Sequence, residues 1–90
     1  MTDENDVAGM ITEITKRMEM LLNDSSVPKN VRTAINEAKM HLDSKEDNII
    51  KVSSAIYSID SISNDINLPS QARTAVWGIL SMLEAIKTSN

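Results

Sequence analysis

Two pairs of oppositely charged residues occupy matching positions in the chain and are its clearest candidates for polar chemistry. Asp24 precedes Arg32 by eight positions, and Asp65 precedes Arg73 by the same spacing. The two guanidinium groups could bind an anionic small ligand, because their planar N–H donors match carboxylate and phosphate oxygens. Alternatively, each Asp accepts hydrogen bonds from the Arg or from free amides at a helix start, and so holds a hairpin together. The duplication favours this structural interpretation, because each hairpin needs such a contact once.

The rest of the sequence offers little for catalysis or metal binding. His41 is the only histidine and cysteine is absent, whereas a structural zinc needs a full set of Cys or His ligands. The sequence contains no Ser-His-Asp combination, glycine-rich phosphate loop or Glu-x-x-His motif. We therefore predict a protein that is not an enzyme and that holds neither a cofactor nor a metal.

Both charged pairs belong to an internal repeat. Residues 23–35 align without a gap with residues 64–76, which lie 41 positions further along the chain. Asn, Asp, Pro, Arg, Thr and Ala occupy matching positions in the two segments. A repeat of this length with its only proline in the middle describes a helix, a short turn and a second helix.

Apolar residues recur at intervals of three and four positions in four segments, which predicts four helices. These helices are expected at about residues 6–22, 28–42, 48–62 and 69–87. The predicted buried stripes are Val7, Ile11, Ile14, Met18, Leu21 and Leu22; Val31, Ala34, Ile35, Ala38 and Leu42; Ile49, Val52, Ala55, Ile56, Ile59 and Ile62; and Ala72, Ala75, Val76, Ile79, Met82, Leu83 and Ile86.

Residue types at the helix starts support these boundaries. Pro28 and Pro69 are expected in the first turn of their helices, where a missing N–H costs no intrahelical hydrogen bond. Ser44 and Asp47 are predicted to form a capping box for the third helix, with Asp in place of the usual Glu.

The predicted connections between helices are all short, which makes consecutive helices antiparallel. Two hairpins, at about residues 6–43 and 47–88, are too few to stack into a solenoid. Packing one hairpin on the other buries all four stripes at once. The sequence therefore predicts a single all-α domain over residues 1–90, an antiparallel up-and-down four-helix bundle made of two repeated hairpins.

Charged residues are distributed unevenly between the two halves. Residues 3–43 contain thirteen charged residues, whereas residues 48–83 contain only four. In this charge-poor half, Ile50, Tyr57 and Trp77 are expected to point away from the core stripes. Together with Arg73 they form a candidate protein-binding patch, because Trp, Tyr and Arg are enriched among binding hot spots. The alternative is that they are the scattered exposed apolar residues common on monomers.

Charge and composition also bear on partners and location. The net charge is −4 and the basic residues are scattered, which disfavours direct binding to nucleic acid or to anionic membranes. The longest uncharged stretch, residues 74–83, is too short to cross a bilayer. With no cysteine and an acidic N-terminal segment that does not resemble a signal peptide, the chain is expected in the cytoplasm.

A further pattern spans both turns and the last helix. It consists of Asn23-Asp24, Val27-Pro28 and Val31-Arg32, followed by Asn64-Asp65, Leu68-Pro69, Ala72-Arg73 and Ala75-Val76-Trp77. This pattern resembles an uncharacterised family of small archaeal helical proteins, over nearly the whole chain. The resemblance implies an archaeal, intracellular four-helix protein and implies no activity, since no function is assigned to that family.

A second resemblance is weaker. Asp24 with Val31-Arg32-Thr33-Ala34 is similar to HEAT-type helical repeats, although the Asp lies two positions too far upstream. HEAT-like units mostly bind other proteins, so this likeness implies a binding role by analogy of architecture.

These observations favour a non-catalytic protein–protein interaction module that self-associates through its third and fourth helices, for example as a homodimer. One alternative is an accessory subunit of a nucleic-acid-associated complex that docks through protein. The other is a binder of anionic small ligands that uses Arg32 and Arg73.

Overall fold

Four helices make up residues 4–88, the part of the chain that the computed structural model describes. The helices are α1 (Glu4–Leu22), α2 (Lys29–Leu42), α3 (Asn48–Asp60) and α4 (Ser70–Thr88). No strand occurs within these residues. The prediction of an all-α protein with four helices is confirmed for this part of the chain.

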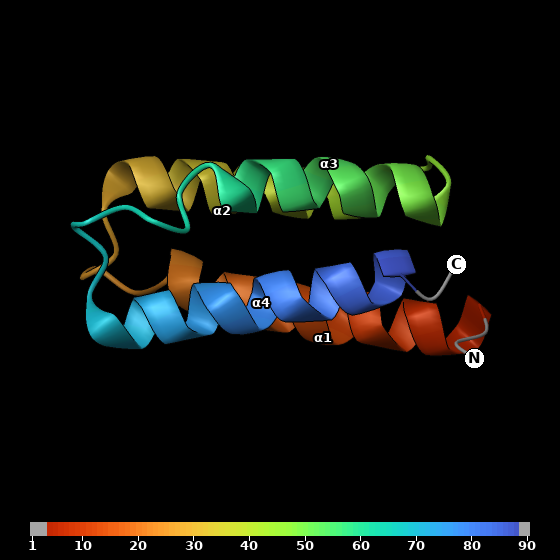
Figure 1. Ribbon diagram of the computed structural model, residues 1–90, viewed down its shortest axis with the longest axis horizontal. Helices are drawn as coiled ribbons and strands as arrows, with labels where there is room; N and C mark the ends of the chain where they lie inside the picture. The colour runs from red at the N-terminus through yellow and green to blue at the C-terminus, as the bar shows by residue number, and fades with distance from the viewer. Residues whose placement is uncertain (1–3, 89–90) are drawn as a thin grey trace.

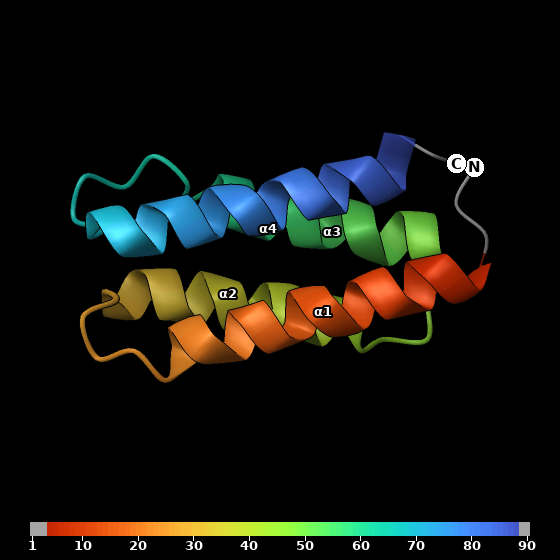
Figure 2. The ribbon, with the colours of Figure 1, turned by 90° about the horizontal axis from the view of Figure 1, so that it is seen from below.

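The helices contact one another in a ring, since α1 packs on α2 and α4, and α3 packs on the same two helices. All four lie along the long axis of the molecule (Figure 1). In the turned view, α1 and α4 lie in front of α2 and α3 (Figure 2). The α1–α2 and α3–α4 connections lie at one end, and the α2–α3 connection lies at the other (Figure 1). This packing is consistent with a four-helix bundle.

The core is aliphatic and draws on every helix. The largest fully buried side chains are Ile14, Met18, Ile35, Ile59, Ile79, Leu83, Ile86, Val27, Val31, Val52 and Val76. Ile62 is also buried, although it lies just beyond the end of α3. Most predicted stripe positions are therefore in the core or packed at its edge.

One predicted core residue is on the surface. Ile49 is 41% exposed, so its assignment to the buried stripe was wrong. Val52, Ala55 and Ile59 set the inward direction of α3, and Ile49 lies about 90° around the helix from their mean direction. Because α3 begins at Asn48, Ile49 lies in its first turn, on the flank of the stripe.

Two details of the helix starts also differ from the prediction. Pro28 and Pro69 each lie one position before their helix, and their carbonyls accept hydrogen bonds from the Arg32 and Arg73 amides at 3.0 and 2.9 Å. The predicted capping box is not formed, because Asp47 is itself the N-cap and its side chain makes no capping bond. Three positions after this N-cap stands Ile50, which cannot return the second bond of a capping box.

The Asp side chains of the two matching connections each close a local turn. Asp24 Oδ1 accepts hydrogen bonds from the Ser26 amide at 2.9 Å and the Ser26 hydroxyl at 2.6 Å. Asp65 Oδ1 accepts one from the Asn67 amide at 2.8 Å. Both are turns in which an Asp side chain binds the backbone two residues further on.

Asp65 also joins the α3–α4 connection to the start of α2. Asn30 Nδ2, at the start of α2, donates a hydrogen bond to Asp65 Oδ2 at 2.8 Å. The bonds from the Asn30 side chain and the Asn67 amide lower the pKa of Asp65 below its usual value. The ionised carboxylate therefore links the α3–α4 connection to the start of α2.

We predict that Asp65→Asn makes the stability of the protein less dependent on pH in the acidic range. A carboxylate whose pKa is lowered by folding stabilises the folded state above its ordinary pKa, and the contribution disappears as the pH falls through the lowered value. Wild type should thus be more stable than the variant at neutral pH, and the difference should shrink on acidification in urea unfolding curves. Asp43→Asn makes the same charge change in the α2–α3 connection and serves as the control. A difference that is constant with pH would contradict this role of Asp65.

A second prediction concerns the two glycines. A methyl group at Gly9 would have no atom outside its own helix within 4 Å, and one at Gly78 would lie at an ordinary contact distance of 3.7 Å from Arg17 Nη1. Both residues lie inside helices. At such positions Gly makes the folded protein less stable than Ala does, by about 0.5–1 kcal/mol. Gly9→Ala and Gly78→Ala should each raise the free energy of unfolding by about that amount. A loss of stability in Gly78→Ala would mean that α1 and α4 need the glycine for close approach.

Candidate functional site

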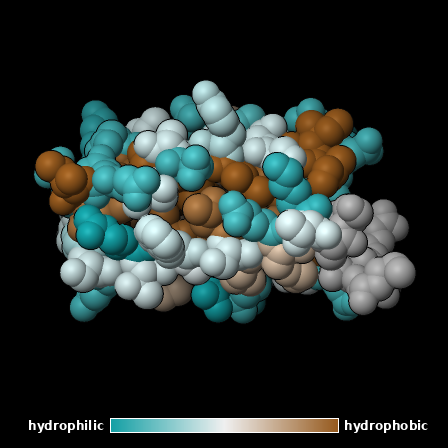
Figure 3. All heavy atoms as spheres, viewed as in Figure 1, coloured by the Kyte–Doolittle hydropathy of each residue, from teal (hydrophilic) through white to brown (hydrophobic). Residues whose placement is uncertain are grey.

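Large apolar side chains are exposed mainly on the second half of the chain. Five of the seven described examples lie there, namely Ile49, Ile50, Tyr57, Ile66 and Trp77, and the other two are Met20 and Met40. In the space-filling view, apolar side chains run along the boundary between α3 and α4 and gather near the start of α3 (Figure 3). We name this region the α3–α4 surface. Its residues are Ile49, Ile50, Ile56, Tyr57, Ile66, Arg73, Trp77 and Leu80.

All four residues of the predicted patch are exposed, and they form two groups on this surface. Ile50 and Tyr57 lie seven positions apart on α3, on the side away from its buried residues, and Tyr57 is 81% exposed. Arg73 and Trp77 lie one helical turn apart on α4. Their binding role stays a prediction.

The Arg73 and Trp77 side chains are held by the connection between α3 and α4. Arg73 Nη2 donates to the Asp65 carbonyl at 3.3 Å, and Trp77 Nε1 donates to the Ser63 carbonyl at 3.4 Å. Trp77 nevertheless remains 55% exposed. These two long bonds limit the orientations of both side chains, which lowers the entropy they would lose on binding.

Four residues of the α3–α4 surface were not predicted as part of the patch, and Ile49, described above, is one of them. Ile56 was assigned to the core and Leu80 was assigned to no stripe. Both are only partly buried and lie at the edge of the core. Ile66, in the α3–α4 connection, is 89% exposed. The partial exposure of Leu80 could have been inferred from the adjacent pair Ile79-Leu80, because neighbours on a helix cannot both face the same core.

The expected Asp–Arg contacts differ between the two matching positions. Arg73 binds the backbone carbonyl of Asp65 rather than its carboxylate. Arg32 Nε is buried and has no hydrogen-bond partner among the described residues. The carboxylates of Asp24 and Asp65 instead accept bonds within their own turns, because the turns place backbone amides directly beside them.

Arg32 and Arg73 do not line a common pocket. Arg32 borders a shallow groove of about 390 Å³, lined also by Leu22, Lys29, Thr33 and Asn36. Arg73 belongs to the α3–α4 surface instead. An anionic ligand in this groove would therefore contact Arg32 and Lys29, without Arg73.

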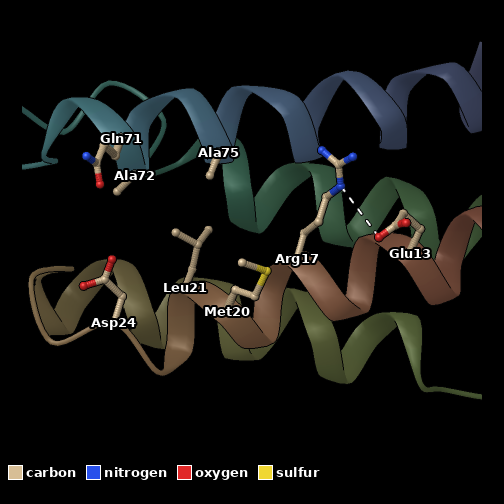
Figure 4. Close-up of a pocket in the computed structure, with 8 residues that line it drawn as sticks. All are labelled: Glu13, Arg17, Met20, Leu21, Asp24, Gln71, Ala72 and Ala75. Atoms are coloured by element: carbon tan, nitrogen blue, oxygen red, sulfur yellow. Dashed lines mark ion pairs between the residues drawn. The ribbon is translucent and has the colours of Figure 1, made fainter.

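A larger groove of about 510 Å³ lies between α1 and α4. Its lining residues are Glu13, Arg17, Met20, Leu21, Asp24, Gln71, Ala72 and Ala75. Figure 4 shows Arg17 extending from α1 toward α4. Its Nε forms an ion pair with Glu13 at 3.9 Å. The lining residues include no Ser, Thr, Cys, Lys or His, the residue types that most often act as nucleophile and base in covalent catalysis.

Other site types find no support within residues 4–88. No three His, Asp or Glu side chains in this range are grouped so that they could hold a metal ion. His41 is partly exposed on α2. None of the described helices combines the length and apolarity needed to cross a membrane.

Comparison with known proteins identifies relatives of similar length. The model of an uncharacterised protein family, UPF0147, matches residues 1–86. A UPF0147 protein of Methanothermobacter thermautotrophicus is 40% identical over 84 residues, which are 92% of this chain and 79% of that protein. One from Methanocaldococcus jannaschii is 41% identical over 71 residues, 78% of this chain and 76% of that protein.

Two solved structures share the fold. The crystal structure of MMP1188, a protein of unknown function, has a TM-score of 0.84 and 35% identity, covering 97% of each chain. That of a UPF0147 protein from Thermoplasma acidophilum has a TM-score of 0.82 and 30% identity, covering 88% of this chain and 94% of the other. The resemblance to an uncharacterised archaeal family is thus confirmed, and the chain belongs to the family UPF0147.

Proposed function

We propose that this protein is a non-catalytic protein–protein interaction module that binds its partner through the α3–α4 surface. The proposal includes the finer architecture expected from the sequence, an antiparallel up-and-down bundle of two repeated hairpins. The partner is a protein, and the simplest candidate is a second copy of the chain. The site of action is the cytoplasm.

The observation that carries the proposal is the exposure of Ile50, Tyr57 and Trp77 in the charge-poor half of the chain. Tyr57 and Trp77 are 81% and 55% exposed although each presents a large apolar area to water. Burying a side chain of this kind is worth about 1.5–3 kcal/mol. Aromatic residues beside an Arg, with few other charges around them, have the composition of an interface core.

The charge distribution argues for protein rather than nucleic acid as the direct partner. The net charge is −4, and the α3–α4 surface contains Arg73 as its single basic residue. Phosphate backbones are bound by clusters of Lys and Arg. A role in a nucleic-acid-associated complex would therefore depend on docking to another protein subunit.

The groove around Arg32 supports a second candidate, a site for an anionic small ligand. The buried Arg32 Nε has no partner among the described residues, and Lys29 lines the same groove. If this site exists, inorganic phosphate should raise the melting temperature of wild type, and Arg32→Gln should abolish the rise. An equal shift in both proteins would mean a general salt effect and no site.

The leading proposal predicts that replacing Tyr57 and Trp77 by Lys weakens self-association about tenfold or more, because two apolar anchors are lost and like charges meet. Sedimentation velocity measures the change. Far-UV circular dichroism should show unchanged helicity, since both side chains lie outside the core.

The matched control is Met20→Lys with Met40→Lys, which adds the same charge at two residues that are 73% and 64% exposed on α1 and α2. Because Trp77 has one bond to the α3–α4 connection, Tyr57→Lys alone provides a variant that removes no described hydrogen bond. The proposed surface would be contradicted if the control pair weakened self-association equally. It would also be contradicted if self-association were unchanged both in Tyr57→Lys and in Tyr57→Lys with Trp77→Lys.

A further inference from the structure

One stripe of α4 has a symmetric spacing, and it consists of three residues of the α3–α4 surface together with Glu84, which lies about one turn further along the helix. Arg73, Trp77, Leu80 and Glu84 follow one another at intervals of four, three and four positions, the spacing that keeps side chains on one face of a helix. Arg73, Trp77 and Glu84 are exposed, and Leu80 is partly buried. The stripe is basic at the start of the helix, apolar in the middle and acidic toward its end.

We infer that this stripe is where a second copy of the chain packs, with its own α4 antiparallel to the first. Arg73 lies as far before Trp77 as Glu84 lies after Leu80. A two-fold axis through the middle of the stripe therefore sets Arg73 opposite Glu84 of the other copy, and Trp77 opposite its Leu80. A two-fold contact requires this kind of self-complementarity. The inference rests on the proposed function, and specifies the partner and the register.

Charge complementarity favours a second copy over an unrelated helix. From Arg73 to Glu84 the stripe extends about 16 Å, at 1.5 Å per residue, and its two charges have opposite sign. In the antiparallel arrangement both meet an opposite charge, so the dimer contains two ion pairs around an apolar centre. In a parallel arrangement in register, Arg73 would meet Arg73 and Glu84 would meet Glu84, which is repulsive.

The position of Arg73 fits the same arrangement. Arg73 is in the first turn of α4, where the helix dipole disfavours a positive charge. An antiparallel α4 from the second copy brings its negative C-terminal half toward this end. Bonds to the Asp65 and Ser63 carbonyls also hold Arg73 and Trp77 on the surface before binding.

The flank of α3 widens the contact. Ile49 and Ile56 lie seven positions apart on α3 and are exposed and partly buried, respectively. They supply apolar area beside the stripe on the same α3–α4 surface. Four apolar residues per copy, Ile49, Ile56, Trp77 and Leu80, then form the centre of the dimer, with the charged residues at its rim.

Charge reversal tests the register. Arg73→Glu leaves two acidic ends in each copy and Glu84→Arg leaves two basic ends, so each variant alone should dimerise at least about tenfold more weakly than wild type. Mixed in equal amounts, the two variants should form a heterodimer, because both pairings are again between opposite charges. The double variant Arg73→Glu with Glu84→Arg should recover the homodimer.

The readout is the mass distribution in sedimentation velocity for each variant, for the mixture and for the double variant. Lys16→Glu and Glu37→Arg make the same charge changes on exposed positions of α1 and α2 and should leave dimerisation unchanged. Glu84→Arg removes no described side-chain bond, so its effect does not depend on the bond that Arg73 makes to the α3–α4 connection.

The outcomes separate this inference from the proposed function. A wild-type protein that stays monomeric at every concentration overturns both the self-association and the register. Association that is lost in Tyr57→Lys with Trp77→Lys, but not recovered in the mixture or in the double variant, overturns the register and leaves the proposed surface standing. Recovery in both the mixture and the double variant supports the antiparallel pairing of α4.

Discussion

Mutual burial of four narrow aliphatic stripes is the constraint on which the rest of this structure depends. Helices of 13 to 19 residues are marginal alone in water and gain most of their stability from packing. The chain has one Trp, one Tyr and no Phe, and both aromatic residues are exposed. The core is therefore filled by smaller aliphatic side chains. Each helix therefore needs its neighbours in the ring, and the connections only have to bring the ends together.

The same constraint decides which apolar side chains stay outside. Val76 and Ile79 are fully buried in α4, while the next residue in each case, Trp77 or Leu80, lies on or near the surface. A helix can turn only one side to the core, so an adjacent apolar pair leaves one member outside. In this chain these outer members gather on α3 and α4. The α3–α4 surface thus follows directly from the way the core is built.

Much of the fold could be predicted from the period of the apolar residues, because burial on one side of a helix imposes that period directly. Ile49 shows the limit of this reasoning. Its spacing fits the stripe, but the inward direction of α3 is set by Val52, Ala55 and Ile59, and the sequence does not give that direction near a helix end. The capping prediction for Ser44 failed for a similar reason, since it needed the exact first residue of α3.

The candidate site was less predictable, because its contacts depend on how the connections fold. Asp24 and Asp65 could be recognised as turn residues from their types and positions. Their actual partners, Ser26 and Asn67 within the turns and Asn30 from α2, follow from backbone positions that no spacing rule specifies. In the same way, exposure of Trp77 was predictable from its place on the helix, whereas its bond to the Ser63 carbonyl was not.

The most direct test of the central claim uses Trp77, the only tryptophan in the chain, as a reporter of the α3–α4 surface. The measurement is acrylamide quenching of its fluorescence in the unmodified protein, across a hundredfold range of concentration on the order of 1–100 μM, where weak to moderate dimers form. If the surface mediates self-association, quenching should decrease as the concentration rises, because the half-exposed indole becomes covered. Quenching that stays the same throughout would show that Trp77 remains open to solvent, and would contradict the claim that this surface is where the chain associates.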